Sequence, residues 1–461
     1  MSSTSIKEDS SFKDPEGFLY YYKNEVRRHI IKDKQEFYAN LIKKPMIIDL
    51  MKSSKLIHTE LIIEGDEIIF KHKKINFVTY PYDWSILQFI DAACFTLDFQ
   101  ISLLNDDLCL KDASPYNILF QENQAIFIDL TSITENRKSK IWLALNQFLE
   151  MFFYPIIINY ERNLSHSDIL KNNINGINPE QTEKILGKTT SYLKYFLELA
   201  LPRILNNQTQ EAQKMINEAT ASNNRNQQAT LTLLKEQLVK IRNNFKNKKM
   251  KSAWSAYTKE IHYGHENYLN KQTIIESILG KLQAKKILDL GSNNGDFSFL
   301  AEANGKTVLS IDSDSSCISH IYEKAKTKGS SVVSIVSDLT NPSPSLGWKN
   351  IERKSLLDRL KMNYQADLVF ALALLHHLLI TCRIPLQEVL KLLHSLTSKY
   401  LIIEFIGPTD EMFLQILSTR ENIYMDLNET HFEELYSKDF TCLDKYKLTQ
   451  SRTLYLLERK T

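Results

Sequence analysis

The chain lacks several features that would assign it to a particular class of protein. Its 461 residues carry a formal net charge of +2, which gives no general attraction to nucleic acid or to an anionic membrane. Residues 1–11 are polar and contain no apolar core of a secretion signal. The longest apolar runs, residues 151–158 and 368–380, are too short to span a bilayer. We therefore expect a cytoplasmic protein that neither crosses a membrane nor binds nucleic acid.

Cysteine is also scarce, and its distribution does not have the spacing of a metal site. The five cysteines are scattered along the chain and form no C-x-x-C pair: Cys94, Cys109, Cys317, Cys382 and Cys442. An odd, dispersed set suits a reducing compartment and argues against disulfides and against a structural zinc site. We expect no bound metal on this basis.

The composition that is present predicts a globular protein of more than one domain. Hydrophobic residues make up 43% of the chain and charged residues 24%, and its length favours two or three domains. We expect an α+β domain over residues 1–204, a polar connector over 205–250 and an α/β domain over 251–461.

The expected connector is rich in Asn, Gln and Lys and has few aromatic residues. Within it, Leu231, Leu234, Leu238 and Ile241 fall at helical spacing and predict an amphipathic helix. Its basic end, residues 240–251, could form a nucleic-acid patch, but a solvated helix face is the favoured interpretation.

The most informative motif is a strand that turns through glycines into a helix. An apolar run at residues 287–290 is followed by Gly291 and Gly295 and then by a helical apolar pattern. Such a turn brings backbone N–H groups and a helix N-terminus against a ligand. The spacing is not the G-x-G-x-x-G of dinucleotide folds. With Asp289 two residues before the first glycine, it resembles motif I of class I S-adenosylmethionine-dependent methyltransferases.

Further strands are expected in the order of an α/β sheet. The apolar runs that predict them cover residues 307–312, 331–338, 366–375, 399–406, 440–447 and 452–458. Helical patterns separate the first four runs, so we expect a doubly wound, mostly parallel sheet that ends in an antiparallel hairpin. The closing hairpin is a further point of resemblance to class I methyltransferases.

The resemblance implies S-adenosylmethionine as cofactor and a set of residues that bind it: Asp289, Gly291, Asn293, Gly295, Asp312, Asp338 and Ala371. Asp312 ends the second strand of the sheet, where an acid accepts hydrogen bonds from ribose hydroxyls. Asp289 would bind the amino group of the cofactor. Asp338 would contact the adenine, although it could instead cap the turn that follows it.

Candidate catalytic residues follow the fourth and fifth strands. His376 and His377 lie just beyond the fourth strand, and Glu404 belongs to the fifth. An alcohol acceptor would need a base to remove its proton, and histidine titrates near neutral pH. We favour His377 over His376, with a packed structural histidine as the open alternative. Glu404 is a second candidate base or substrate contact.

Two segments near this domain could cover the site. The long segment 341–357 contains Trp348, Glu352 and Arg353, and we expect it to bind the acceptor or to act as a lid; a packing decoration is the alternative. The lead-in at residues 253–265 is of the kind that closes over the cofactor in methyltransferases.

In the N-terminal half, we expect strands at residues 17–31, 61–69 and 75–80 and helices before residue 55 and over 85–104. Asp112, Asn117 and Asp129 then follow in an order that resembles the catalytic loop and metal-binding strand of protein-kinase-like phosphotransferases. ATP and magnesium would bind there. The sequence departs from that pattern, since it has no glycine-rich loop and Arg28 is the nearest substitute for the phosphate-pairing lysine. Alternatively, these residues cap a turn around Pro115 and end an ordinary strand.

Both halves together are similar to a bacterial family of predicted methyltransferases that includes rhizobial nodulation-type (NoeA-like) proteins. The residues that carry the similarity include those at 80–84, 110–117, 289–295, 338–348 and 371–377. We therefore expect a methyltransferase that modifies an oxygen of a small-molecule or saccharide-type acceptor. The alternatives are a bifunctional kinase–methyltransferase and a methyltransferase whose first half only docks a partner, through a surface near residues 80–84.

Overall fold

The computed structural model describes residues 5–65, 67–136, 141–187, 224–247, 264–418 and 427–460. The chain divides into two compact units. The first comprises Met1–Lys249 together with Leu346–Arg353, and the second comprises Met250–Ser345 together with Lys354–Thr461. Most of the predicted lead-in at residues 253–265 lies outside the described residues.

The first unit begins with an antiparallel sheet of order β1-β2-β3-β5-β4. Its strands are β1 (Ser5–Lys7), β2 (Gly17–Tyr22), β3 (Glu25–Ile30), β4 (Thr59–Glu64) and β5 (Glu67–His72). Lys23 and Asn24 connect β2 to β3 with positive φ angles of 47° and 68°, as a two-residue hairpin turn requires. Helices α1 (Lys32–Leu41) and α2 (Pro45–Lys52) follow β3, as predicted for this stretch.

The strand predicted at residues 75–80 is wrong. Strand β5 pairs with β3 on one side and with β4 on the other, so the segment after it finds no free edge beside β5. Its apolar side chains Ile75 and Val78 pack instead against a small cluster formed by Ile57, Leu119 and Ile126.

Helix α3 (Ile86–Leu104) is the central helix of the first unit and confirms the helix predicted there. Ser85 and Gln88 form a capping box at its start. By length and composition α3 could cross a membrane, but 67% of its most apolar window is buried inside the protein, as in the core helix of a globular domain. Helix α3 contains no long uninterrupted apolar run in the sequence because Gln88, Asp91 and Asp98 interrupt it.

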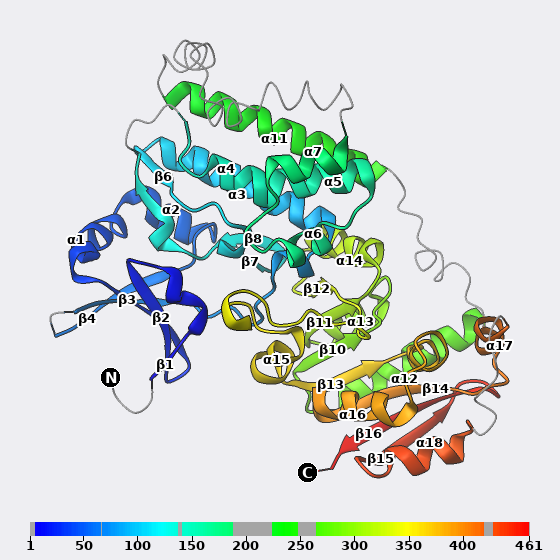
Figure 1. The fold of residues 1–461 in the computed structure, drawn as a ribbon. Helices are drawn as coiled ribbons and strands as arrows, with labels where there is room; N and C mark the ends of the chain where they lie inside the picture. Colours follow the sequence, from blue (N-terminus) through cyan, green and yellow to red (C-terminus); the bar gives the residue numbers. More distant parts are fainter. Residues whose placement is uncertain are drawn as a thin grey trace. The chain divides into compact units, whose positions relative to one another are not determined.

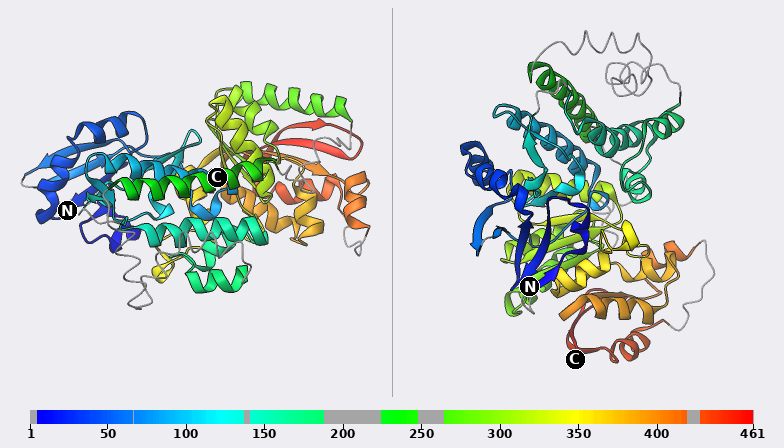
Figure 2. Two further views of the ribbon diagram at one scale, coloured as in Figure 1. Left: turned by 90° about the horizontal axis from the view of Figure 1, so that it is seen from above. Right: turned by 60° about the vertical axis from the view of Figure 1, so that its left-hand side comes forward.

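Helix α11 (Asn224–Asn247) lies alongside α3 (Figures 1 and 2). The predicted apolar stripe, Leu231, Leu234, Leu238 and Ile241, is buried. Arg242 makes a two-pronged ion pair with Asp91 of α3, at 2.5 and 3.0 Å. This part of the expected connector therefore belongs to the first unit, while residues 205–223 and 248–250 are outside the described chain.

Two small two-stranded sheets and a group of helices complete the first unit. One sheet pairs β6 (Leu108–Leu110) with β9 (Ile133–Glu135), and the other is the hairpin of β7 (Ile118–Gln121) and β8 (Gln124–Phe127). The helices are α4 (Leu145–Phe148), α5 (Tyr154–Arg162), α6 (His166–Asn172) and α7 (Pro179–Leu186).

The surface predicted near residues 80–84 is wrong, because this segment belongs to the core of the first unit. Tyr82 and Trp84 have no exposed surface. The indole N–H of Trp84 donates to the Thr79 hydroxyl at 2.8 Å, and the Asp83 carboxylate accepts from the Tyr80 amide at 2.7 Å. Aromatic residues so enclosed contribute to stability and cannot contact a partner.

The second unit is built on a seven-stranded sheet of order β12-β11-β10-β13-β14-β16-β15 (Figure 1). Its strands are β10 (Lys286–Leu290), β11 (Thr307–Asp312), β12 (Val333–Val336), β13 (Ala366–Ala371), β14 (Thr397–Ile406), β15 (Phe440–Lys447) and β16 (Arg452–Arg459). β10 to β14 are parallel, and β16 and β15 form the antiparallel end. The predicted doubly wound sheet with a terminal hairpin is confirmed.

Helices connect these strands and supply the apolar faces that cover the sheet. They are α12 (His265–Lys281), α13 (Asp296–Ala303), α14 (Ser315–Lys328), α15 (Leu356–Arg359), α16 (Leu386–Leu396), α17 (Glu411–Leu417) and α18 (Glu429–Tyr436). One core cluster unites Ile275 and Ile278 of α12, Ile321 of α14 and the sheet residues Phe370 and Ile402.

The buried His166 makes the first unit sensitive to acid. Its ring stacks on Phe89 with centroids 4.7 Å apart, and Nε2 lies 3.1 Å from the Trp84 carbonyl oxygen. Burial lowers the pKa of His166 to about 4 from an ordinary 6.5. Between these pH values the unfolded chain binds a proton that the folded chain does not, so stability is lost as the pH falls from 6.5 towards 4.

We predict that the free energy of unfolding falls less steeply with decreasing pH in His166→Phe than in the wild type. The slopes should differ by the contribution of one proton, about 1.4 kcal/mol per pH unit. Phenylalanine keeps the stack on Phe89 but cannot titrate. The measurement is the opening free energy of α3 from hydrogen exchange between pH 4 and 7. If the opening free energy falls equally steeply with decreasing pH in the variant and the wild type, the assignment is contradicted, whatever their absolute stabilities.

Candidate functional site

A cavity of about 320 Å³ opens at the carboxyl ends of the parallel strands of the second unit. That edge of an open α/β sheet is where such folds bind ligands. Its volume is at the lower end of the range for small-molecule sites. The lining residues are Tyr268, Lys271, Asp289, Gly291, Ser292, Asn293, Asn294, Asp296, Phe297, Ile311, Asp312, Ser313, Ser337, Asp338, Leu339, Thr340, Leu372, Ala373, Leu374, His377, Leu378, Thr381 and Cys382.

The turn between β10 and α13 requires glycine at two positions. Gly291 and Gly295 have φ angles of 71° and 80°, which side chains rarely adopt. A Cβ at Gly295 would lie 2.8 Å from Ile321, and one at Gly291 would lie 3.1 Å from Leu374. The glycines thus let the turn pack between neighbouring side chains, and Gly291 lines the cavity whereas Gly295 does not. Asn293, at φ 49°, lines the cavity as well.

Asp312 at the end of β11 fixes this turn from the side. Its Oδ2 accepts the backbone N–H of Asn293 at 2.8 Å, and its Oδ1 accepts that of Asp314 at 2.8 Å. Burial raises the pKa of Asp312, and these two N–H groups act in the opposite direction. The carboxylate therefore accepts hydrogen bonds from the backbone of the turn and also lines the cavity.

Asp289 is buried beneath the turn and also lines the cavity. Its Oδ2 accepts from the Ser298 hydroxyl at 2.5 Å, and Ser298 in turn accepts from Ser310 at 2.7 Å. Burial raises the pKa of Asp289 to about 6. At neutral pH the group is still an anion, and a ligand cation beside it would favour that state.

Asp338, after β12, lies at the exposed side of the cavity. Its Oδ1 accepts from the backbone N–H of Thr340 at 2.8 Å and from the Thr340 hydroxyl at 2.7 Å. The structure thus gives Asp338 the turn-capping contacts of the alternative interpretation, both of them to Oδ1. Both interpretations remain compatible with its place in the cavity wall.

The segment after β13 forms another wall of the cavity. Ala371 is buried and does not line the cavity, whereas the next three residues, Leu372 to Leu374, do. Ala373 adopts a positive φ of 50°, a conformation that costs free energy for a residue with a Cβ. Its N–H donates to Glu404 Oε2 at 3.0 Å, and this bond helps hold the strained backbone in place.

The two histidines occupy different environments. His377 lines the cavity from the π-helical turn His377–Thr381, whereas His376 is fully buried and does not. Their ring centroids are 4.1 Å apart. Burial and the charge of Arg452 lower the pKa of His377 to about 4, and burial lowers that of His376 well below its usual value. His377 is therefore a neutral imidazole at physiological pH and a weak base.

Glu404 lies behind the cavity wall rather than in it. Its carboxylate has no exposed surface and accepts from Lys271 Nζ at 2.5 Å, while Arg452 Nη1 lies 3.5 Å away. Arg452 in turn holds Asp410, with Nε–Oδ2 and Nη2–Oδ1 distances of 2.7 and 2.9 Å. Burial would raise the pKa of Glu404, but the two cations outweigh it and lower the pKa. This environment suits a carboxylate that positions other groups better than a base.

Lys271 and Tyr268 of α12 were missed by the sequence reasoning, although both line the cavity. A signal existed for Lys271. It stands four and seven residues before the buried Ile275 and Ile278, so a charged residue occupies the apolar stripe of the helix. Tyr268, whose hydroxyl donates to Asp296 at 2.7 Å, carried no comparable signal.

The segment 341–357 does not line the cavity. Its central part, Leu346–Arg353, groups with the first unit. Glu352 is buried there and pairs with Lys13 at 2.7 Å, and the Arg353 guanidinium lies 4.1 Å from the centre of the Tyr116 ring. Trp348 remains 60% exposed. An acceptor-binding or lid role for this segment stays a prediction.

The structure brings Asp112, Asn117 and Asp129 close together in the first unit. Asn117 Nδ2 donates to the Ser132 hydroxyl at 3.3 Å, and that hydroxyl donates to Asp129. Burial raises the pKa of Asp112, and the charge of Asp129 adds to the effect. Within the described ranges, no group of three or more His, Cys, Asp or Glu side chains is arranged to hold a metal ion.

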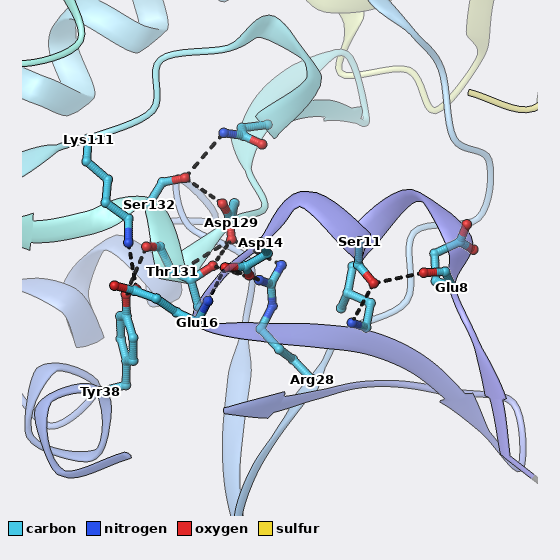
Figure 3. A network of polar contacts seen from close by, with 12 residues as sticks. Glu8, Ser11, Asp14, Glu16, Arg28, Tyr38, Lys111, Asp129, Thr131 and Ser132 are labelled. Carbon is cyan, nitrogen blue, oxygen red and sulfur yellow. Dashed lines mark hydrogen bonds and ion pairs between the residues drawn. The ribbon is translucent and has the colours of Figure 1, made fainter. Parts of the chain in front are cut away.

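Asp129 is surrounded by donors (Figure 3). Its Oδ1 accepts from Arg28 Nη2 at 3.1 Å, from the Thr131 amide at 3.2 Å and from the Thr131 hydroxyl at 2.6 Å, while Oδ2 accepts from Ser132. Burial would raise the pKa of Asp129, but Arg28 and the hydroxyls lower it. Three of these donors meet Oδ1 and one meets Oδ2, so Oδ1 has no acceptor site left for a further donor.

Arg28 of β3 is the buried cation of this network. Its guanidinium also pairs with Asp14 and donates to Thr131 Oγ1 at 2.6 Å. A second group lies beside it, in which Glu16 accepts from Lys111 at 2.6 Å and Tyr38 donates to the Thr131 carbonyl at 2.9 Å (Figure 3). Arg28, which the sequence suggested as the nearest substitute for a phosphate-pairing lysine, thus pairs with carboxylates.

Comparison with known proteins shows one similarity along nearly the whole chain. No family model matches the sequence. The nodulation protein NoeA of Rhizobium meliloti (strain 1021) is 27% identical over 463 residues, which cover 97% of this chain and 95% of that protein. The predicted similarity to NoeA-like proteins is therefore confirmed over both units.

Solved structures are similar to part of the chain. Magnesium protoporphyrin IX methyltransferase from Synechocystis PCC 6803 with bound SAH matches 42% of this chain and 84% of its own, at 16% identity and a TM-score of 0.29. The N-methyltransferase NodS from Bradyrhizobium japonicum WM9 in complex with S-adenosyl-l-homocysteine matches 42% of this chain and 88% of its own, at 11% identity and a TM-score of 0.31.

Proposed function

We propose that the protein is an S-adenosylmethionine-dependent methyltransferase that acts on an oxygen of a small-molecule or saccharide-type acceptor. The observation that carries the proposal is the position of Asp312. It ends the second strand of the parallel sheet, lines the cavity and binds the backbone of the glycine turn. An acid in that position is suited to accept hydrogen bonds from ribose hydroxyls.

The cavity fits the chemistry of this cofactor. Four aspartates line it, Asp289, Asp296, Asp312 and Asp338. S-Adenosylmethionine carries an ammonium and a sulfonium, and carboxylates stabilise both. The apolar side chains of Ile311, Leu339 and Leu372 among the lining residues suit a purine ring. When bound, the cofactor would supply an electrophilic methyl group.

The residues of the chain then have to align the acceptor and manage its proton. Methyl transfer is an in-line displacement, so alignment supplies much of the rate. His377 lines the cavity and is neutral, so its imidazole is able to accept a hydrogen bond or a proton from an acceptor hydroxyl. Its lowered pKa favours a hydrogen-bonding and orienting role over complete proton removal from a ground-state alcohol.

The first test is calorimetric titration with S-adenosylmethionine and S-adenosylhomocysteine. We predict binding to the wild type and a roughly tenfold to hundredfold loss of affinity in Asp312→Ala, because a hydrogen bond to a charged group is worth about 1.5–3 kcal/mol. Asp314→Ala is the control, since Asp314 does not line the cavity and its carboxylate accepts from the Ser316 N–H at 2.8 Å. Absence of binding to wild-type protein would reject the proposal, as would unchanged affinity in Asp312→Ala.

A second candidate function concerns the first unit, which we propose docks a partner instead of transferring phosphoryl groups. The engagement of Asp129 by Arg28, Thr131 and Ser132 argues against phosphoryl transfer, because a magnesium ion that binds this carboxylate would compete with these donors. The bifunctional kinase–methyltransferase is the competing interpretation, and the proximity of Asp112, Asn117 and Asp129 is what favours it.

We predict that ATP with magnesium leaves the melting temperature of the first unit unchanged. A ligand at one hundred times its Kd would stabilise the folded state by about 2.7 kcal/mol, a shift that is readily measured. Asp129→Asn is the control variant. A magnesium-dependent rise in the wild type that is lost in Asp129→Asn would contradict this prediction and support the bifunctional kinase–methyltransferase.

A further inference from the structure

Lys271 is a buried lysine that faces the cavity from α12. Its side chain is 2% exposed, and its ammonium donates to Glu404 Oε2 at 2.5 Å. It also lies 4.8 Å from the centre of the Phe297 ring, which lines the same cavity. The ammonium therefore lies where the wall formed by α12 meets the start of α13.

The hydrogen-bonding capacity of this ammonium is not used up by the protein. An ammonium group has three N–H donors, and in the part of the chain that the structure describes the one hydrogen-bond acceptor of Lys271 Nζ is Glu404 Oε2. Placing a lysine inside a protein is costly unless its charge is compensated and its donors find acceptors. A ligand in the cavity that Lys271 lines could supply the missing acceptors.

The charges of the cavity indicate which group this is. Four aspartates and one lysine are found among the described lining residues, and the lining histidine His377 is neutral. An anionic group that enters such a cavity is repelled by the aspartates, and Lys271 is the one side-chain cation among the described lining residues that attracts it. The N–H groups of the glycine turn and the start of α13 would add to this attraction. S-Adenosylmethionine carries a single carboxylate, on its methionine part, beside an ammonium that suits the aspartates.

We propose that Lys271 binds the methionine carboxylate of the cofactor and so sets the orientation of the methionine part. This inference rests on the proposed function. Glu404 is then a positioning residue. It holds Lys271 Nζ at 2.5 Å and the backbone N–H of Ala373 at 3.0 Å, and thereby fixes the cation against the wall that follows β13.

The experiment compares two ligands that differ only in this carboxylate, S-adenosylmethionine and decarboxylated S-adenosylmethionine, by calorimetric titration. The full-length wild type should prefer the carboxylated ligand by at least about tenfold, as for other charge-assisted hydrogen bonds. In Lys271→Gln the two affinities should become equal within about twofold. Lys271→Arg should retain part of the preference, because it keeps the charge.

Lys324→Gln is the matched control. Lys324 belongs to α14, lies 3.8 Å from Asp296 and 4.3 Å from the Phe299 ring centre, and does not line the cavity. It should leave the preference intact. If Lys271→Gln does not fold, the titration uses the double variant Lys271→Gln with Glu404→Gln. This double variant removes the charges of both partners, so neither is left buried and unpaired by the other's loss.

The outcomes separate this inference from the proposed function. A wild type that binds both ligands equally well overturns the role of Lys271 but leaves the cofactor assignment in place. The role is likewise overturned if Lys271→Gln weakens both ligands by the same factor, since the lysine then only supports the fold. Failure of the wild type to bind either ligand overturns the proposed function.

Discussion

The buried carboxylate of Glu404 is the constraint on which the cavity of the second unit depends. It belongs to β14 and accepts from Lys271 of α12 and from the backbone of Ala373 after β13, with Arg452 of β16 at 3.5 Å. Four separate elements thus meet at one group that has no exposed surface. Removing one partner of such a network leaves an uncompensated charge and typically costs about 3–5 kcal/mol.

The first unit uses a comparable device around Asp129. There Arg28 supplies the cation, and Thr131 and Ser132 supply the remaining donors. The two networks differ in what they leave available. In the second unit an ammonium faces a cavity, whereas in the first unit Asp129 is held by an arginine and two hydroxyls. This difference supports the proposal that the ligand site lies in the second unit.

The sheet of the second unit could be predicted well because its signals are local. Each parallel strand is a short apolar run that ends in a turn, and β11 and β15 begin and end at the predicted residues. Asp289, Gly291 and Asp312 line the cavity, as expected for strand ends that meet at one edge of such a sheet, whereas Gly295 does not line it. The strand predicted at residues 75–80 failed because pairing on both sides of β5 is a non-local property that periodicity does not contain.

The partners within the site could not be predicted for the same reason. Lys271 and Glu404 are 133 residues apart, and Arg28 and Asp129 are about 100 residues apart, so only the folded chain brings them together. The pKa of His377 is likewise set by burial and by Arg452, which no local pattern reveals. Glu404 lies behind the cavity wall, and its role as a base, which was inferred from position alone, stays a prediction.

The most direct test of the account is an experimental structure of the full-length protein crystallised with S-adenosylhomocysteine. The account predicts ligand density in the cavity of the second unit, with the ribose hydroxyls within hydrogen-bonding distance of Asp312 and the amino-acid end beside the turn that contains Gly291 and Gly295. A cavity that stays empty at saturating ligand, or a ligand bound elsewhere, would contradict it.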